Sequence, residues 1–216
     1  MIVSNNAEFL EHIDLLIKKV RKVIGWIPHS FLNRSLEFMK RMWISIVRPL
    51  IDYGSQIWSP QEGPLVDRIE KLQYDYSKLI PEIRNMSYEM RLKKMNLSSL
   101  QRRFERYKIF YTWNIIQGIV PECGLNIRSM KNSRNGLKFE VKKTEKSRIG
   151  KIRDQSFQVS APKIWNSLPI FIRNLETTSK AEFKTALDSY LRDIPDIPRL
   201  GYSTWAKNSL VDILGF

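Results

Sequence analysis

The sequence predicts a mainly α-helical protein, a helical bundle with a small basic β-hairpin insertion near residues 125–145. Apolar residues recur every three or four positions through most of the chain, which is the period of an amphipathic helix. Pro, Gly, Ser and Asn occupy the breaks between these stretches. Between residues 124 and 153 the helical period is lost, and Asn135-Gly136, a dipeptide typical of hairpin turns, precedes alternating apolar residues.

The first predicted helix covers residues 7–24. Its apolar positions share one face, and they are Ile13, Leu16, Ile17, Val20 and Ile24. Four basic residues occupy the other face: Lys18, Lys19, Arg21 and Lys22. Gly25 and Pro28 interrupt the pattern and predict the end of this helix.

A second helix is predicted from about Leu32 past Pro49, within the stretch IVRPLIDYGSQIWSP. Because Pro lacks a backbone N–H, we expect a kink there. Gly54 then allows another backbone to approach, and Tyr53 and Trp58 fill the space that the kink creates. We interpret this stretch as scaffold rather than as a binding site, because large apolar aromatics belong mostly to cores.

Three further helices are predicted, over residues 65–79, 88–95 and about 98–118. Asn85 or Ser87 caps the second of them, and Ser98 or Ser99 caps the third. The third is basic in its first half and apolar all round in its second half, so we expect it to run from a charged surface into the core.

The remainder of the chain begins with the most basic segment of the sequence. Residues 128–153 contain ten Lys or Arg and two Glu, and they predict a basic β-ribbon or a mobile loop. A short helix follows within 154–170, and a last helix over 179–192 begins with a capping box of Ser179 and Glu182. The expected domains are a helical domain over 1–122, the hairpin with a helical extension over 123–195, and a loosely packed tail over 196–216.

The charge favours anionic partners. The chain has 216 residues and a net charge of +14, from 36 Lys and Arg against 22 Asp and Glu. Such a field favours nucleic acid first and acidic membrane second. No apolar run approaches the ~20 residues that span a bilayer, and Met1–Leu10 lacks the pattern of a signal peptide. We therefore expect an intracellular protein, cytoplasmic or nuclear, with no membrane partner.

No catalytic or metal site is predicted. The single cysteine, Cys123, excludes an internal disulfide and a multi-cysteine zinc site. His12 and His29 each stand alone, and the pair Asp67 and Glu70 is typical of a solvated helix face. No phosphate-binding loop, nucleophile elbow or metalloprotease motif occurs, so no cofactor is expected in this chain.

Two basic clusters are the candidate sites for nucleic acid, because Lys and Arg neutralise phosphates. The first holds Arg91, Lys93, Lys94, Arg102, Arg103, Arg106 and Lys108. The second holds Lys142, Lys143, Arg148 and Lys151. Phe104 and Tyr107 alternate with the first cluster, but they lie on the apolar stripe of their helix, and we interpret them as core residues.

Six segments occur in an order that is more specific than any one of them. They are VRPLIDYGSQIWSP (47–60), VDRIEKLQ (66–73), YEMRLKKMNLSSLQRR (88–103), NIIQGIVPE (114–122), RDQSFQVSAPKIWNSLPIFIRN (153–174) and EFKTAL (182–187). Together they resemble the polymerase proteins of non-LTR retrotransposons, especially jockey-like and related animal elements, downstream of the reverse transcriptase core. The resemblance covers roughly residues 12–195.

The resemblance implies the helical thumb and post-thumb region of an RNA-directed DNA polymerase. In that family this region is expected to hold template RNA and the primer–template duplex, and the catalytic aspartates belong to an aromatic-x-Asp-Asp motif of the palm. No Asp-Asp dipeptide occurs in this chain. The implied function is therefore nucleic-acid binding without catalysis, with RNA, an RNA–DNA duplex or other parts of a retroelement polymerase as partners.

Two alternatives stay open at this point. In one, the chain is a protein-interaction module, whose docking face is apolar surface that a palm domain would otherwise cover. In the other, it is a non-functional relic of a degenerate element, although its intact hydrophobic periodicity favours a surviving fold.

Overall fold

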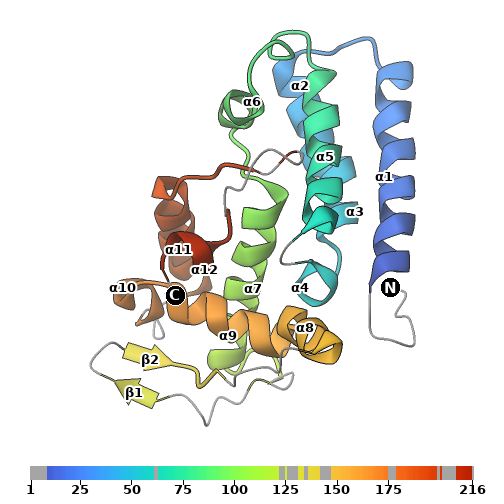
Figure 1. Cartoon of the computed structure of the whole chain (residues 1–216). Helices are drawn as coiled ribbons and strands as arrows, with labels where there is room; N and C mark the ends of the chain where they lie inside the picture. Colours follow the sequence, from blue (N-terminus) through green and yellow to red (C-terminus); the bar gives the residue numbers. More distant parts are fainter. Residues whose placement is uncertain are drawn as a thin grey trace. The chain divides into compact units, whose positions relative to one another are not determined.

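The computed structural model describes residues 9–60, 63–121, 125, 131–133, 136–141, 147–174, 179–198, 200 and 208–215. These residues are mainly helical, which confirms the predicted class (Figure 1). The chain divides into two compact units: unit 1 is Met1–Arg103 with Asp196–Ala206, and unit 2 is Phe104–Pro195 with Lys207–Phe216. The division lies inside one long helix, whereas the sequence suggested a boundary after residue 122.

Unit 1 contains seven labelled helical segments and the first residues of α7. They are α1 (Leu10–Ser30), α2 (Leu36–Met42), the π-helical turn η1 (Trp43–Val47), α3 (Arg48–Asp52), α4 (Ser55–Trp58), α5 (Pro64–Lys78), α6 (Tyr88–Met95) and α7 (Leu100–Ile116). Helix α1 packs against α5 and α3 (Figure 1). The core between these helices contains Val20, Met39, Trp43, Ile51 and Tyr76, all fully buried.

Helix α1 is longer than predicted. The expected end at Gly25 is wrong, because the helix continues through Gly25 and Pro28 to Ser30. Ile27 is completely buried, so the apolar face continues for one turn beyond Gly25. Pro28 lies so close to the C-terminus that its missing N–H costs only one hydrogen bond near a helix end.

Pro49 interrupts the second predicted helix in a specific way. Between α2 and α3 the chain forms one π-helical turn, and the N–H of Arg48 donates to the carbonyl of Trp43, five residues earlier. A proline ring crowds the carbonyl four residues before it, and the wider turn gives that carbonyl room. Pro49 itself takes one of the first positions of α3. At the position of the expected kink, the chain therefore forms a π-helical turn that precedes Pro49.

The end of this stretch is only partly as expected. Trp58 is buried, and its Nε1 donates to the carbonyl of Tyr53 at 2.8 Å. Gly54 has a φ of 64°, a left-handed conformation that favours glycine, and it separates α3 from α4. Tyr53, however, is 75% exposed and fills no interior space. Of the two aromatics, only Trp58 belongs to the core.

Side-chain caps set the beginnings of α6 and α7. The Oγ of Ser87 accepts a hydrogen bond from the N–H of Met90, and the Oγ of Ser99 accepts one from the N–H of Arg102 at 3.1 Å. Both serines were among the predicted caps, because Ser accepts from the free N–H groups of a first helical turn.

A buried carboxyl group also reaches the first turn of α7. Glu70 of α5 accepts a hydrogen bond from the N–H of Leu100 at 2.8 Å and another from the hydroxyl of Tyr88. Burial raises the pKa of Glu70 to about 8. The sequence suggested a solvated face for Glu70 and Asp67. For Glu70 this is wrong, because the side chain serves as an internal cap.

Unit 2 contains the rest of α7 and seven further labelled elements. They are β1 (Lys131–Ser133), β2 (Gly136–Lys138), α8 (Arg148–Gln155), α9 (Phe157–Ser167), α10 (Ile170–Arg173), α11 (Lys180–Asp193) and α12 (Leu210–Ile213). The rings of Trp113 and Phe183 stack at the centre of its core, 4.9 Å apart. Ser179 and Glu182 form the predicted capping box of α11.

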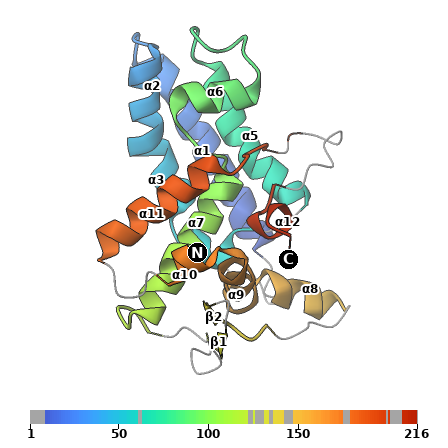
Figure 2. The same cartoon turned by 90° about the vertical axis from the view of Figure 1, so that its left-hand side faces the viewer.

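Two three-residue strands lie in the predicted insertion. Strands β1 and β2 pair antiparallel, with Ser133 opposite Gly136, and β2 contacts α9 and α10 (Figure 2). The predicted turn residue Asn135 lies outside the described residues. Directly after β2, the N–H and C=O of Phe139 form hydrogen bonds with the side-chain amide of Asn166 on α9, at 2.9 and 2.8 Å. This paired amide fixes the end of the strand to the helix.

Two predictions for the C-terminal part are corrected. Residues 148–155 form helix α8 rather than ribbon or loop, with Ser147 as its N-cap. Within the expected loose tail, Leu210 is completely buried in the core of unit 2. Both carboxylate oxygens of Glu105 accept from the N–H of Leu210, at 3.1 and 3.2 Å. An internal acceptor thus caps α12 from α7.

Candidate nucleic-acid interface

Two arginines of α7 form ion pairs within their units, and the third is buried. Arg103 donates from Nε and Nη2 to the two oxygens of Asp52, at 2.8 and 2.7 Å. Arg106 makes the same forked contact with Asp188 of α11. Arg102 is 2% exposed. A guanidinium paired with a carboxylate has little net charge to offer a phosphate, so these predicted contacts serve the fold.

Lys108 lies in the interior of unit 2. Its side chain is completely buried, and its Nζ donates to the Oγ of Ser160 on α9 at 3.2 Å. Burial lowers the pKa of Lys108 to about 7, and the carboxylate of Glu105, one turn away, partly offsets this effect. The predicted phosphate contact is thus a buried amine close to neutrality at physiological pH.

Arg91 is enclosed by aromatic rings. Its guanidinium carbon lies 4.5 Å from the ring centre of Tyr74 and 5.2 Å from that of Tyr88. Nη1 donates to the carbonyl of Tyr74 at 3.0 Å and to the Oγ of Ser77 at 2.7 Å. The side chain is 1% exposed. Arg91 therefore ties α6 to α5 by cation–π contacts and hydrogen bonds.

The other predicted contacts divide into two groups. Lys93 and Lys94 of α6 are exposed, and Lys93 pairs with Glu89 one turn earlier at 2.7 Å. Lys142 and Lys143 lie outside the described residues, and Arg148 and Lys151 belong to α8, where the description covers the backbone only. Of the first predicted cluster, only the two lysines of α6 are therefore exposed.

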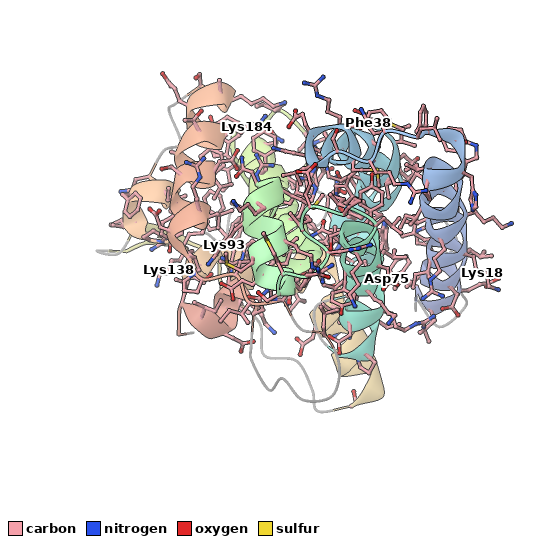
Figure 3. The ribbon with its side chains drawn as sticks, turned by 90° about the horizontal axis from the view of Figure 1, so that it is seen from above. Lys18, Phe38, Asp75, Lys93, Lys138 and Lys184 are labelled. Atoms are coloured by element: carbon pink, nitrogen blue, oxygen red, sulfur yellow. The ribbon has the colours of Figure 1, made fainter. Side chains whose placement is uncertain are left out.

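A stronger basic surface lies on α1, and the sequence prediction passed it over. We define the α1 basic face as Lys18, Lys19, Arg21 and Lys22, all of which are exposed. In Figure 3 the Lys18 side chain lies on the outer side of α1, away from α5. The sequence contained the signal, four cations within five positions opposite an apolar stripe. The prediction favoured α7 because arginines and aromatics alternate there.

The acidic groups nearby neutralise little of this face. Asp14, one turn before Lys18, forms an ion pair with Arg68 of α5. Glu11 is exposed at the start of the helix. The α1 basic face itself forms no ion pair with any described residue. These acidic side chains therefore leave a local excess of positive charge on the α1 basic face, and such an excess attracts polyanions.

Other classes of site find no support in the described part of the chain. It contains no cluster of three or more metal-ligating His, Cys, Asp or Glu side chains. None of its helices has both the length and the apolar character needed to cross a bilayer. His12 packs its ring against Trp58, with 5.4 Å between centroids, and burial lowers its pKa. No protein-family model, curated protein or solved structure matches this sequence.

Proposed function

We propose that the chain binds nucleic acid through the α1 basic face, as a non-catalytic module that resembles the thumb and post-thumb region of a non-LTR retrotransposon reverse transcriptase. Its ligand is RNA or an RNA–DNA duplex. The observation that supports this proposal most directly is four exposed cations on one helix face with no acidic partner among the described residues, in a chain of net charge +14.

The rigidity of α1 supports the proposal physically. Its opposite face, with Val20 and Ile27 completely buried, is anchored in the core of unit 1. The cations are therefore presented on a fixed helix, and binding orders only their side chains. Each phosphate contact releases condensed counterions, so the affinity should fall steeply with salt.

The finer part of the proposal concerns the basic hairpin insertion. Residues 128–153 carry ten Lys or Arg, including Lys142, Lys143, Arg148 and Lys151. We assign them a secondary role as phosphate contacts that follow the nucleic-acid backbone, together with Lys93 and Lys94. Arg91, Arg102 and Lys108 have no part in it, because their side chains are buried.

The experiment is a salt series with the purified full chain, a labelled RNA and a labelled RNA–DNA duplex. A triple variant replaces Lys18, Lys19 and Lys22 by Ala. We expect a steep negative slope of log affinity against log salt for the wild type, and a slope smaller by about two to three for the variant.

A matched control removes three exposed cations of α11 in unit 2, Lys180, Lys184 and Arg192. It lowers the net charge by the same amount and should retain most of the affinity and slope. Equal losses in both variants would contradict a site on α1, and a folded wild type that binds neither ligand at low salt would refute the proposed function.

A further inference from the structure

An exposed tryptophan continues the α1 basic face. Trp26 lies one helical turn after Lys22 and two turns after Lys19, so the three side chains share one side of the helix. The Trp26 side chain is 51% exposed, more than Leu10 and Leu15, the two other large apolar side chains of α1 that face solvent, at 44% each. A large aromatic that faces water beside exposed cations can offer its ring face to a ligand.

Neighbouring aromatics support the indole from one side. The ring of Phe31 meets Trp26 edge to face, with 5.7 Å between centroids, and Phe31 in turn contacts Phe38 of α2 at 5.3 Å. Phe38 is labelled on α2 in Figure 3. Leu32, in the loop beside this row, is fully exposed. The row holds Trp26 in place while half of its surface stays in contact with water.

We propose that the outer face of α1 binds a single strand, with its phosphates on Lys18, Lys19 and Lys22 and one base stacked on Trp26. This inference rests on the proposed function and specifies its ligand. Aromatic side chains bordered by cations are the means by which proteins hold single strands without reading sequence, because every base presents a π-face. The base stacks on the exposed part of the indole, and Phe31 supports the opposite part.

A duplex cannot use Trp26 in this way. Its base faces are already stacked on one another, and an indole on the convex side of a helix reaches only the phosphates and groove edges. A membrane fits less well, because interfacial helices insert their apolar face. In α1 that face is packed against α5 and α3. The α1 basic face and Trp26 together thus favour single-stranded nucleic acid.

The test compares a labelled 12-nucleotide oligouridine, which forms no secondary structure, with a 12-base-pair RNA–DNA duplex. Trp26→Ala, Trp26→Phe and the control Tyr53→Ala are measured in the full chain. Tyr53 is an exposed aromatic of the same unit, outside α1. We expect Trp26→Ala to weaken oligouridine binding about tenfold while duplex binding changes less than twofold. Trp26→Phe should restore most of the loss, and Tyr53→Ala should behave as the wild type.

The salt slope separates stacking from charge. It should be unchanged in Trp26→Ala, because no phosphate contact is lost. Wild-type affinity of Trp26→Ala for oligouridine would overturn the inference and leave the proposed function standing. An equal loss of affinity for both nucleic acids would also overturn it. Vesicles of anionic lipid are measured in parallel, and a Trp26→Ala variant that loses affinity for the vesicles alone would overturn it as well. A wild type that binds neither nucleic acid would instead refute the proposed function itself. Circular dichroism verifies that each variant is folded.

Discussion

Arg103 and Asp52 form a forked ion pair across 51 residues of sequence, with two parallel hydrogen bonds of 2.8 and 2.7 Å. Each side chain is 16% exposed. The pair joins the start of α7 to the end of α3, within unit 1. Arg103, which the sequence predicted to bind phosphate, therefore stabilises the tertiary structure instead.

Arg103→Ala should lower the free energy of unfolding by about 2–3 kcal/mol, because it leaves the partly buried carboxylate of Asp52 with a weaker partner, Arg48 at 3.8 Å. The control is Arg41→Ala, which breaks an exposed pair with Glu37 and should cost less than about 0.5 kcal/mol. Urea unfolding measures both. Similar costs for the two variants would contradict a structural role for Arg103.

Lys108 predicts a rise of stability with pH. Its pKa is about 7 in the folded chain and near 10.5 when unfolded, so between these values the unfolded state binds more protons. The contribution of Lys108 to the free energy of unfolding should therefore increase from pH 7 upward, by at most about 1.4 kcal/mol per pH unit. Lys108→Met should remove this rise and be the more stable protein below pH 7. Urea titrations from pH 6 to 9 test it, and parallel curves for the two proteins would disprove it.

Glu70 predicts the opposite slope at lower pH. Burial raises its pKa from 4.5 to about 8, so between these values the folded state binds more protons than the unfolded state. Its contribution is fully present below pH 4.5 and is lost as the pH rises through 8. Glu70→Gln should abolish this decline. The measurement is the difference between wild-type and variant stability from pH 4.5 to 8, and a constant difference would exclude the buried acid.

Trp58 and Tyr53 predict contrasting effects within one motif. Trp58→Ala removes a side chain that is 2% exposed and should cost about 3–5 kcal/mol. Tyr53→Ala removes one that is 75% exposed and should cost less than about 0.5 kcal/mol. Thermal and urea unfolding compare them. Under conditions in which Trp58→Ala stays folded, its affinity for RNA should equal that of the wild type, and a stable variant with lost affinity would show that this stretch is a binding site.

The predictions that the structure confirms depend on local properties of the chain. The beginnings of α6 and α11 follow from Ser87, Ser179 and Glu182, because a cap needs only the residues of its own first turn. The end of α1 was missed because Ile27 is buried by other helices, and that packing overrides the helix-breaking tendency of Gly25 and Pro28.

Sequence by itself determined the helical class, the boundaries of α5, α6 and α11 to within one residue, and the positive charge, because periodicity, capping and composition are properties of neighbouring residues. Only the tertiary structure decided which cations are available to a ligand. The helical period assigns a residue to a face of its helix, but it does not identify the residue's partner. The carboxylates that pair with Arg103 and Arg106 lie 51 and 82 residues away in the sequence. The cations of α1 stay exposed because its apolar face takes up the contacts with α5 and α3.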